Sequence, residues 1–208
     1  MITDVCISIP ATATYSLSDL SAELKSNGWA RCLVTGISAA EKSETCIPAV
    51  RIQASSAKEL QTAVRSAGKD MTVIVNAGDN SFNRSALTMG KVRFLAGLEN
   101  LPKNGFDHIT AKLAADKNVA LVIELAAVID YRTRKNALKA YADILALQRK
   151  YRFPLAIASG ARSCAGIRTV HETVALCSLF GMERREVYAA LEAADSVLFP
   201  PETVEAES

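Results

Sequence analysis

The sequence predicts an α/β fold, a TIM-like (β/α) barrel in a single domain. Apolar, β-prone runs alternate with amphipathic helical stretches about every 26 residues along the chain, the pattern of parallel α/β folds. The 208 residues fit one domain, and the 50% apolar and 22% charged content is that of a globular protein. About eight strands with one helix each favour the barrel, although ~250 residues are more typical. A doubly wound open sheet is the alternative.

Each expected strand is a short apolar run bounded by turn residues. Pro10 ends the first of them, and the break at Ser159-Gly160-Ala161 ends the run that Pro154 opens. The expected strands are, in order, residues 4–9, 30–37, 49–54, 71–75, 92–96, 119–123, 154–158 and 196–199.

Each expected helix has apolar residues three or four positions apart, and several begin at a residue that can cap a helix. Ser16 and Ser18, Ser55-Ser56 and Asp107 are such caps. The expected helices are residues 19–27, 57–68, 83–88, 108–117, 133–151, 170–179 and 183–194. Residues 1–200 are thus expected to form the single barrel domain, and the acidic PETVEAES at 201–208 a flexible tail.

Composition predicts a cytoplasmic protein with no membrane partner. No apolar run approaches the ~18–20 residues of a membrane span, and MITDVCISIP has no basic stretch typical of a signal peptide. The five cysteines are widely spaced and contain no C-x-x-C pair, which favours reduced thiols over disulfides or a zinc cluster.

Familiar catalytic motifs are missing from the sequence. There is no G-x-G and no G-x-S-x-G, and HETVA, which starts at His171, has alanine where a second metal ligand would stand in H-E-x-x-H. No metal site is therefore expected on the protein. In a barrel, chemistry gathers at strand ends, where Asn76, Asp79, Glu124 and Ser159 lie.

Two of these strand-end residues leave an enzymatic alternative open. Asp79 and Glu124 could form an acid/base pair with a metal, in a stand-alone barrel phosphoesterase. The structural interpretation is that each caps a helix or pairs with an arginine, and that Ser159 is a turn residue.

Charge is distributed unevenly along the chain. Residues 84–168 contain 15 Lys and Arg against 6 Asp and Glu, whereas residues 169–208 contain 2 against 8. Four basic residues gather near the start of the long helix: Arg132, Arg134, Lys135 and Lys139. Cations at a helix N-terminus oppose its dipole, so this cluster is suited to a polyanion such as RNA. A solvated helix face with a few surface ion pairs is the structural alternative.

Four stretches resemble one known family in order and spacing. They are NAGDNSFNRSA (76–86), KVRFLAG (91–97), FDHITAKLAADKNVALVIEL (106–125) and RKYRFPLAIASGARS (149–163), the last followed by IRTVHETVALCSLFGM (167–182). Together these stretches, within about residues 71–190, resemble archaeal ribonuclease P protein component 3, the 30-kilodalton ribonuclease P subunit family. Ala77, Arg93 and Thr169-Val170 depart from the family pattern in detail.

The resemblance implies a TIM-like barrel in a ribonucleoprotein that removes the 5′ leader from precursor tRNA. It implies that the RNA performs the cleavage with Mg²⁺ held by the RNA, so that the protein binds no cofactor and contacts precursor tRNA only indirectly. It implies a small ferredoxin-like partner subunit, bound in a heterotetramer. The positions carried over by motif are Asp79, Asn83, Arg84, Ser159, Gly160, Ala161, Arg162 and Arg168. The arginines among them join the 132–139 cluster as expected RNA-binding residues. A protein–protein scaffold without RNA contact is the third hypothesis.

Overall fold

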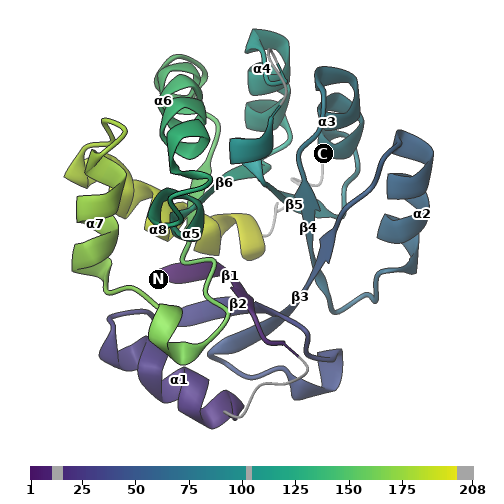
Figure 1. Ribbon diagram of the computed structural model, residues 1–208. Coiled ribbons are helices and arrows are strands. Elements are labelled where there is room, and N and C mark those ends of the chain that lie inside the picture. The colour runs from purple at the N-terminus through teal and green to yellow at the C-terminus, as the bar shows by residue number, and fades with distance from the viewer. Residues whose placement is uncertain (11–15, 102–104, 201–208) are drawn as a thin grey trace, which may run out of the picture.

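The computed structural model describes residues 1–10, 16–101 and 105–200, which form one α/β barrel (Figure 1). The strands are β1 (Thr3–Ser8), β2 (Arg31–Thr35), β3 (Cys46–Ile52), β4 (Thr72–Asn76), β5 (Val92–Ala96), β6 (Ala120–Glu124) and β7 (Leu155–Ala158). The α-helices are α1 (Leu17–Ser26), α2 (Ala57–Ser66), α3 (Asn80–Leu87), α4 (His108–Asp116), α5 (Leu125–Ile129), α6 (Arg134–Tyr151), α7 (Val170–Ser178) and α8 (Arg184–Leu198). Short 3₁₀ turns are η1 (Ala39–Glu41), η2 (Leu98–Asn100) and η3 (Cys164–Gly166).

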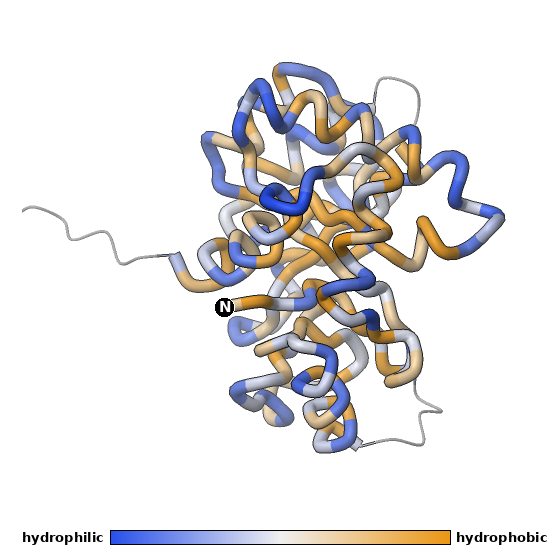
Figure 2. The backbone as a smooth tube through the Cα atoms, turned by 90° about the vertical axis from the view of Figure 1, so that its left-hand side faces the viewer, coloured by the Kyte–Doolittle hydropathy of each residue, from blue (hydrophilic) through white to orange (hydrophobic). Residues whose placement is uncertain are grey.

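All seven strands are parallel and pair in chain order from β1 to β7. Side chains alternate between two apolar layers, as in β6, where Ala120 and Val122 face the barrel interior and Leu121 and Ile123 face the surrounding helices. The strands form the apolar centre of Figure 2, with polar segments at the periphery. The expected barrel fold is confirmed.

The expected eighth strand at 196–199 is wrong, because this segment ends helix α8 and the turn that follows it. Buried side chains recur at helical spacing from Val187 through Ala194 to Val197, so the apolar run at 196–199 continues a helix face. Ala194 and Val197 pack in the barrel interior, and Asp195 pairs with Arg31 at the start of β2 at 2.7 Å. Helix α8 therefore fills the amino-terminal end of the barrel.

Several other boundaries differ from the expected ones. Helix α5 directly follows β6 and was not expected, since five residues are too few to show a helical period. Strand β3 begins at Cys46 rather than Ala49, and α3 at Asn80 rather than Asn83, because Asp79 caps it. Residues 102–104 and the expected acidic tail at 201–208 lie outside the described residues.

Strands β1 and β7 do not share a ladder, and a buried carboxylate bridges the seam between them. Backbone bonds join Gly160 N to Cys6 O at 3.2 Å and Ser8 N to Ala161 O at 2.9 Å. Between them, Asp4 Oδ1 accepts hydrogen bonds from Ser159 N at 2.9 Å and from Cys6 N at 3.2 Å. At the seam where the barrel closes, the Asp4 carboxylate thus accepts hydrogen bonds from backbone N–H groups in place of backbone carbonyls.

Replacing Asp4 by asparagine is expected to remove one component of the pH dependence of folding. Burial raises the pKa of Asp4 to about 6 against the opposing bonds from Ser159 and Cys6. A raised folded-state pKa means that the stabilising contribution is complete below about pH 4 and is lost as pH rises through about 6. Protonation of Asp4 should therefore raise the free energy of unfolding by about 1 kcal/mol as pH falls from 8 to 5. The asparagine side chain retains the Oδ1 acceptor without the titration.

The measurement is urea unfolding of the wild type and of Asp4→Asn across this pH range. Other carboxylates titrate in both proteins, so the difference between the two curves isolates Asp4. A difference that does not change with pH would contradict the prediction.

No helix of the described part of the chain is long and apolar enough to cross a membrane. All five cysteines are free thiols, and Cys32 and Cys46 lie side by side on β2 and β3 with their sulfurs 3.9 Å apart.

Candidate nucleic-acid interface

The carboxyl-terminal mouth of the barrel, where barrel enzymes place their chemistry, is occupied by an ion pair. Arg51 Nη2 of β3 lies 2.7 Å from Glu124 Oε1 of β6, and Arg51 Nε donates to Asn76 Oδ1 at 2.7 Å. Burial alone would lower the pKa of Arg51, but the Glu124 carboxylate outweighs it and the pKa is raised.

A second carboxyl lies beside this pair. Glu99 Oε2 accepts a hydrogen bond from the Tyr141 hydroxyl at 3.2 Å, and this hydroxyl accepts one from the Glu124 backbone N–H at 3.1 Å. Burial and the charge of Glu124 raise the pKa of Glu99. Sequence reasoning missed Arg51, Glu99 and Tyr141, although an arginine inside the apolar run IPAVRI was a usable signal.

Asp79, the other half of the hypothetical acid/base pair, caps α3 by accepting a bond from Phe82 N at 2.8 Å. Glu124 is 7% exposed and paired with Arg51. Both carboxylates are therefore committed to structural contacts, as the structural interpretation expected. Among the described residues, no group of three or more His, Cys, Asp or Glu could hold a metal ion.

The turn after β4 depends on Asn83, whose side chain is fully buried. Its Oδ1 accepts a bond from Gly78 N at 2.8 Å, and its Nδ2 donates to Gly78 O at 2.9 Å and to Gly105 O at 2.8 Å. Arg84, next in sequence, pairs with Asp107 at 2.6 Å and joins α3 to the start of α4. Asn83 thus holds the turn together, and the guanidinium of Arg84 already has a carboxylate partner.

The Ser-Gly-Ala turn after β7 is equally structural. Ser159 is 2% exposed, and its Oγ accepts a bond from Ala161 N at 3.1 Å. Gly160 has a φ of +66°, and a Cβ there would lie 2.8 Å from the Cβ of Ala126. Only glycine fits this left-handed position against α5.

The basic cluster lies in and after the turn between α5 and α6, at the carboxyl-terminal end of the barrel. Arg132 pairs with Asp130 at 2.8 Å and remains 72% exposed, and Arg132 is the main reason that the pKa of Asp130 falls to about 2. Arg134 donates to Val128 O at 2.8 Å and Ile129 O at 2.6 Å, so it caps the end of α5. The negative charge of Asp130, which lies just before α6, therefore offsets part of the unfavourable interaction between these cations and the dipole of α6.

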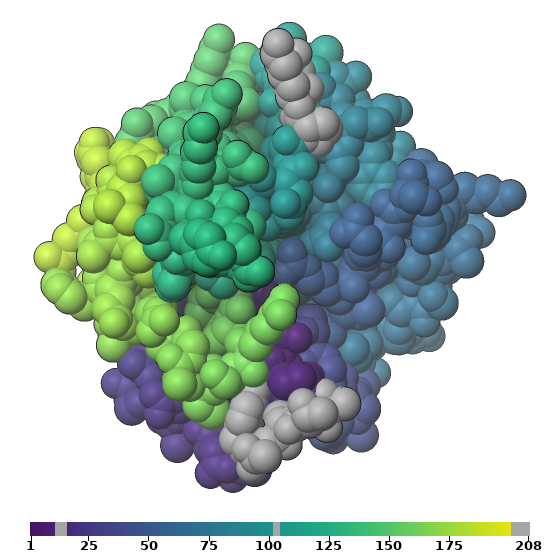
Figure 3. Space-filling view, viewed as in Figure 1, coloured from purple at the N-terminus to yellow at the C-terminus, as the bar shows by residue number. Residues whose placement is uncertain are grey.

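Lys135 and Lys139 follow one turn apart on α6, both exposed and neither ion-paired with a described residue. Arg162 and Arg168 lie in the connection between β7 and α7, Arg162 exposed and Arg168 half-buried. Trp29 Nε1 donates to Arg168 O at 2.7 Å and anchors this connection to α1. The segments after β6 and after β7 lie next to each other on one face in Figure 3. The fold thus gathers five of the seven expected RNA-binding residues at the carboxyl-terminal end of the barrel: Arg132, Arg134, Lys135, Lys139 and Arg162. Arg84 is tied into the α3–α4 contact, and Arg168 lies beside Trp29, next to the start of β2.

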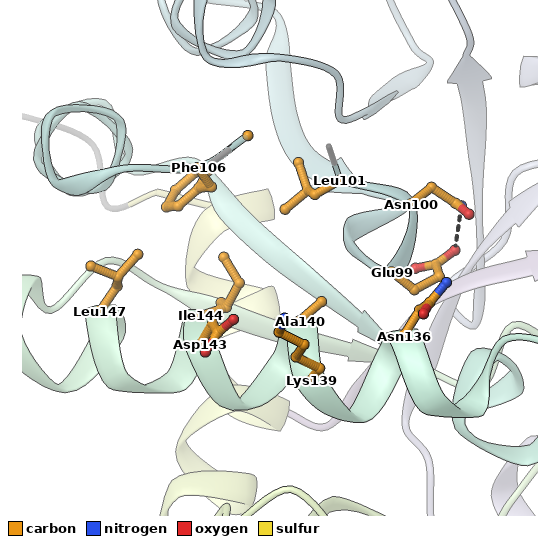
Figure 4. A pocket seen from close by; sticks show the side chains of 11 residues that line it. Glu99, Asn100, Leu101, Phe106, Asn136, Lys139, Ala140, Asp143, Ile144 and Leu147 are labelled. Carbon is orange, nitrogen blue, oxygen red and sulfur yellow. Dashed lines mark hydrogen bonds between the residues drawn. The ribbon is translucent and has the colours of Figure 1, made fainter. Parts of the chain in front are cut away.

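A groove of about 750 Å³ runs beside this cluster, between η2 and α6 (Figure 4). Leu101, Phe106 and Ile144 provide its apolar lining, and Lys139 and Asp143 stand along α6. Glu99, which lies beside the Arg51–Glu124 pair, also lines this groove, whereas neither member of the pair does.

The model of one protein family, described as RNase P subunit p30, matches residues 3–202. The chain belongs to this family. The predicted resemblance is confirmed, and the match extends well beyond residues 71–190, on which the resemblance rested.

Individual archaeal relatives agree with the family assignment. Ribonuclease P protein component 3 of Methanococcoides burtonii is 37% identical over 119 residues, which are 56% of this chain and 49% of the relative. The protein of the same name from Methanothermobacter thermautotrophicus is 34% identical over 146 residues, 68% of this chain and 60% of the relative. The matched part thus spans about half or somewhat more of these relatives.

Solved structures support the fold. A chain of an archaeal ribonuclease P solved with mature tRNA superposes with a TM-score of 0.75 at 20% identity, covering 93% of this chain and 89% of that one. A histidinol phosphate phosphatase from Lactococcus lactis, solved with zinc, histidinol and phosphate, gives 0.54 at 13% identity, covering 86% and 94%. At these identities both matches concern the fold alone.

Proposed function

We propose that the protein is a subunit of ribonuclease P that supports RNA-catalysed removal of the 5′ leader from precursor tRNA by binding and stabilising the catalytic RNA. The family match over residues 3–202 is the observation that carries this proposal. The basic end of the barrel is consistent with it, because cations that reach solvent on one face can neutralise RNA phosphates.

The proposed partners are the ribonuclease P RNA and a small ferredoxin-like protein subunit, in a heterotetramer located in the cytoplasm. Mg²⁺ is assigned to the RNA, and precursor tRNA is contacted only indirectly. The proposed RNA-binding residues are Arg84, Arg132, Arg134, Lys135, Lys139, Arg162 and Arg168. The contacts of Arg84 and Arg134 add structural roles to two of them.

The stand-alone phosphoesterase is not favoured, because Asp79 caps a helix and Glu124 is paired with Arg51. A scaffold without RNA contact is the remaining alternative. It differs from the proposed function in one measurable respect, direct affinity of the chain for the RNA.

Reconstitution tests the proposal. Precursor-tRNA cleavage at limiting Mg²⁺ is compared for the ribonuclease P RNA with its other protein subunits, with and without this chain. Addition of the chain is expected to raise the rate of correct 5′ cleavage, and the chain alone should bind the RNA in a gel-shift assay. Rate enhancement without RNA binding would favour the scaffold, and no enhancement would contradict the proposed function.

A further inference from the structure

One aromatic side chain on the basic end of the barrel is unusually exposed. Tyr131, in the turn between α5 and α6, is 80% exposed, the highest value among the large exposed hydrophobic residues of the described chain. An isolated exposed aromatic needs no explanation by itself. Its surroundings are what make this one informative.

The turn that carries Tyr131 is fixed on both sides. Thr133 Oγ1 donates to Ala127 O at 2.8 Å, and Arg134 donates to the last carbonyls of α5. On the turn itself, the Arg132 backbone N–H and guanidinium both donate to Asp130. The backbone of Tyr131 is thus held by its neighbours while the ring projects into solvent. A ring presented in this way loses little conformational entropy on binding.

Exposed cations follow the ring closely in sequence. The Arg132 guanidinium lies 5.9 Å from the centre of the Tyr131 ring, and Lys135 is exposed one turn further along. The other large exposed hydrophobic residues lie elsewhere: Met1 before β1, Ile109 on α4, Leu179 after α7 and Phe199 after α8. A protein-binding hot spot needs an apolar core around its aromatic anchor, which this turn does not offer. An aromatic ring among cations is instead the composition of surfaces that bind single-stranded nucleic acid.

We propose that Tyr131 is a stacking site for an unpaired base of RNA, with Arg132 and Lys135 on the flanking phosphates. This inference rests on the proposed function and adds a preference for a loop, bulge or end over a regular helix. In A-form duplexes the bases are stacked on each other and cannot stack on a side chain, whereas a splayed base can. Stacking tolerates any base, so no sequence preference is required.

The test uses the full-length chain and two fluorescein-labelled probes, a 12-nucleotide oligouridylate and a 12-base-pair RNA duplex. Tyr131→Leu, which keeps apolar bulk but removes the ring, is expected to weaken binding of the single strand about tenfold. Tyr131→Phe should stay within twofold of the wild type, because stacking needs the ring and not the hydroxyl. Duplex affinity and the salt dependence should not change, because no charge is removed.

The matched control is Phe199→Leu. Phe199 is also exposed and lies 4.9 Å below the guanidinium of an arginine, Arg31, but at the opposite end of the barrel. This variant should bind both probes like the wild type. Circular dichroism and thermal unfolding of all variants separate loss of binding from loss of fold.

Several results would overturn the inference. One is that the Tyr131→Leu variant binds the oligouridylate as tightly as the wild type. Another is that Tyr131→Phe loses as much affinity for it as Tyr131→Leu does. A third is that the wild type has no affinity for the single strand. The proposed function is judged separately by reconstitution, so it survives if the wild type still enhances cleavage while Tyr131→Leu has no effect.

Discussion

Replacing Arg132, Lys135 and Lys139 together by alanine is expected to weaken binding of ribonuclease P RNA on the order of 10²-fold at ~0.1 M salt. Each lost phosphate contact should also flatten the log–log salt dependence by ~0.7–0.9. These side chains are exposed on the α5–α6 turn and on the face of α6 that follows it. Arg134 is left in place, because it caps α5 and its loss would disturb the turn as well as the charge.

A control variant removes the same number of positive charges, three, from a different surface of the protein. Lys58, Arg65 and Lys69 lie in and just after α2, and all three are exposed. Their triple alanine variant should lose far less affinity, since a non-contacting charge acts only through the screened long-range field. Filter binding or fluorescence anisotropy between about 50 and 300 mM salt provides the slopes. An unchanged slope in the first variant would place this cluster outside the RNA interface.

Replacing Arg51 by methionine is expected to lower the free energy of unfolding by about 3 kcal/mol. Glu124 is 7% exposed, and Arg51 is its one counter-charge among the described residues, at 2.7 Å. Methionine has similar bulk, so the main change is a buried carboxylate without a partner. Removing one member of a buried pair costs far more than the intact pair contributes, because the remaining charge has lost its hydration without compensation.

Urea unfolding at pH 7 measures this effect. The double variant Arg51→Met with Glu124→Gln should recover most of the loss, since the neutral amide removes the uncompensated charge. Arg65→Met on the exposed face of α2 is the matched control and should stay within about 0.5 kcal/mol of the wild type. If Arg51→Met were as stable as this control, the barrel mouth would not depend on the ion pair.

The Arg51→Met variant and the triple alanine variant also bear on function. Because the Arg51–Glu124 pair lies inside the mouth, its loss should act on RNA binding only through stability. The Arg132, Lys135 and Lys139 variant should behave in the opposite way, with affinity lost and folding retained. If the barrel mouth were an active site, loss of the Arg51–Glu124 pair should affect function directly. If the protein instead binds RNA through its surface, the exposed cluster of Arg132, Lys135 and Lys139 should matter more.

The sequence alone determined the barrel, because hydrophobic periodicity and turn residues are local signals, and the resemblance of its motif stretches in order and spacing indicated the family. Seven strands lie where apolar runs end at turn residues, with boundaries within about three residues of those expected. The end of α8 was mistaken for a strand because four residues cannot reveal a period of 3.6. The sequence indicated motif turns around Asn83 and Gly160 but not their structural roles. Asn83 is buried and its side chain holds two loops together, and Gly160 has a left-handed conformation in close contact with α5.

Only the tertiary structure decided which charged side chains are paired within the fold and which are exposed for binding. Glu124, a candidate acid by its place at a strand end, is paired across the barrel mouth with Arg51, which lies 73 positions earlier in the chain. Asp4 showed no role until the seam between β1 and β7 placed it against Ser159. Among the basic residues, Arg84 and Arg134 have partners that spacing could not predict, whereas Lys135 and Lys139 extend into solvent. The reason is physical: periodicity reports which face of an element is buried, but pairing of charges depends on contacts between elements that only the closed barrel brings together.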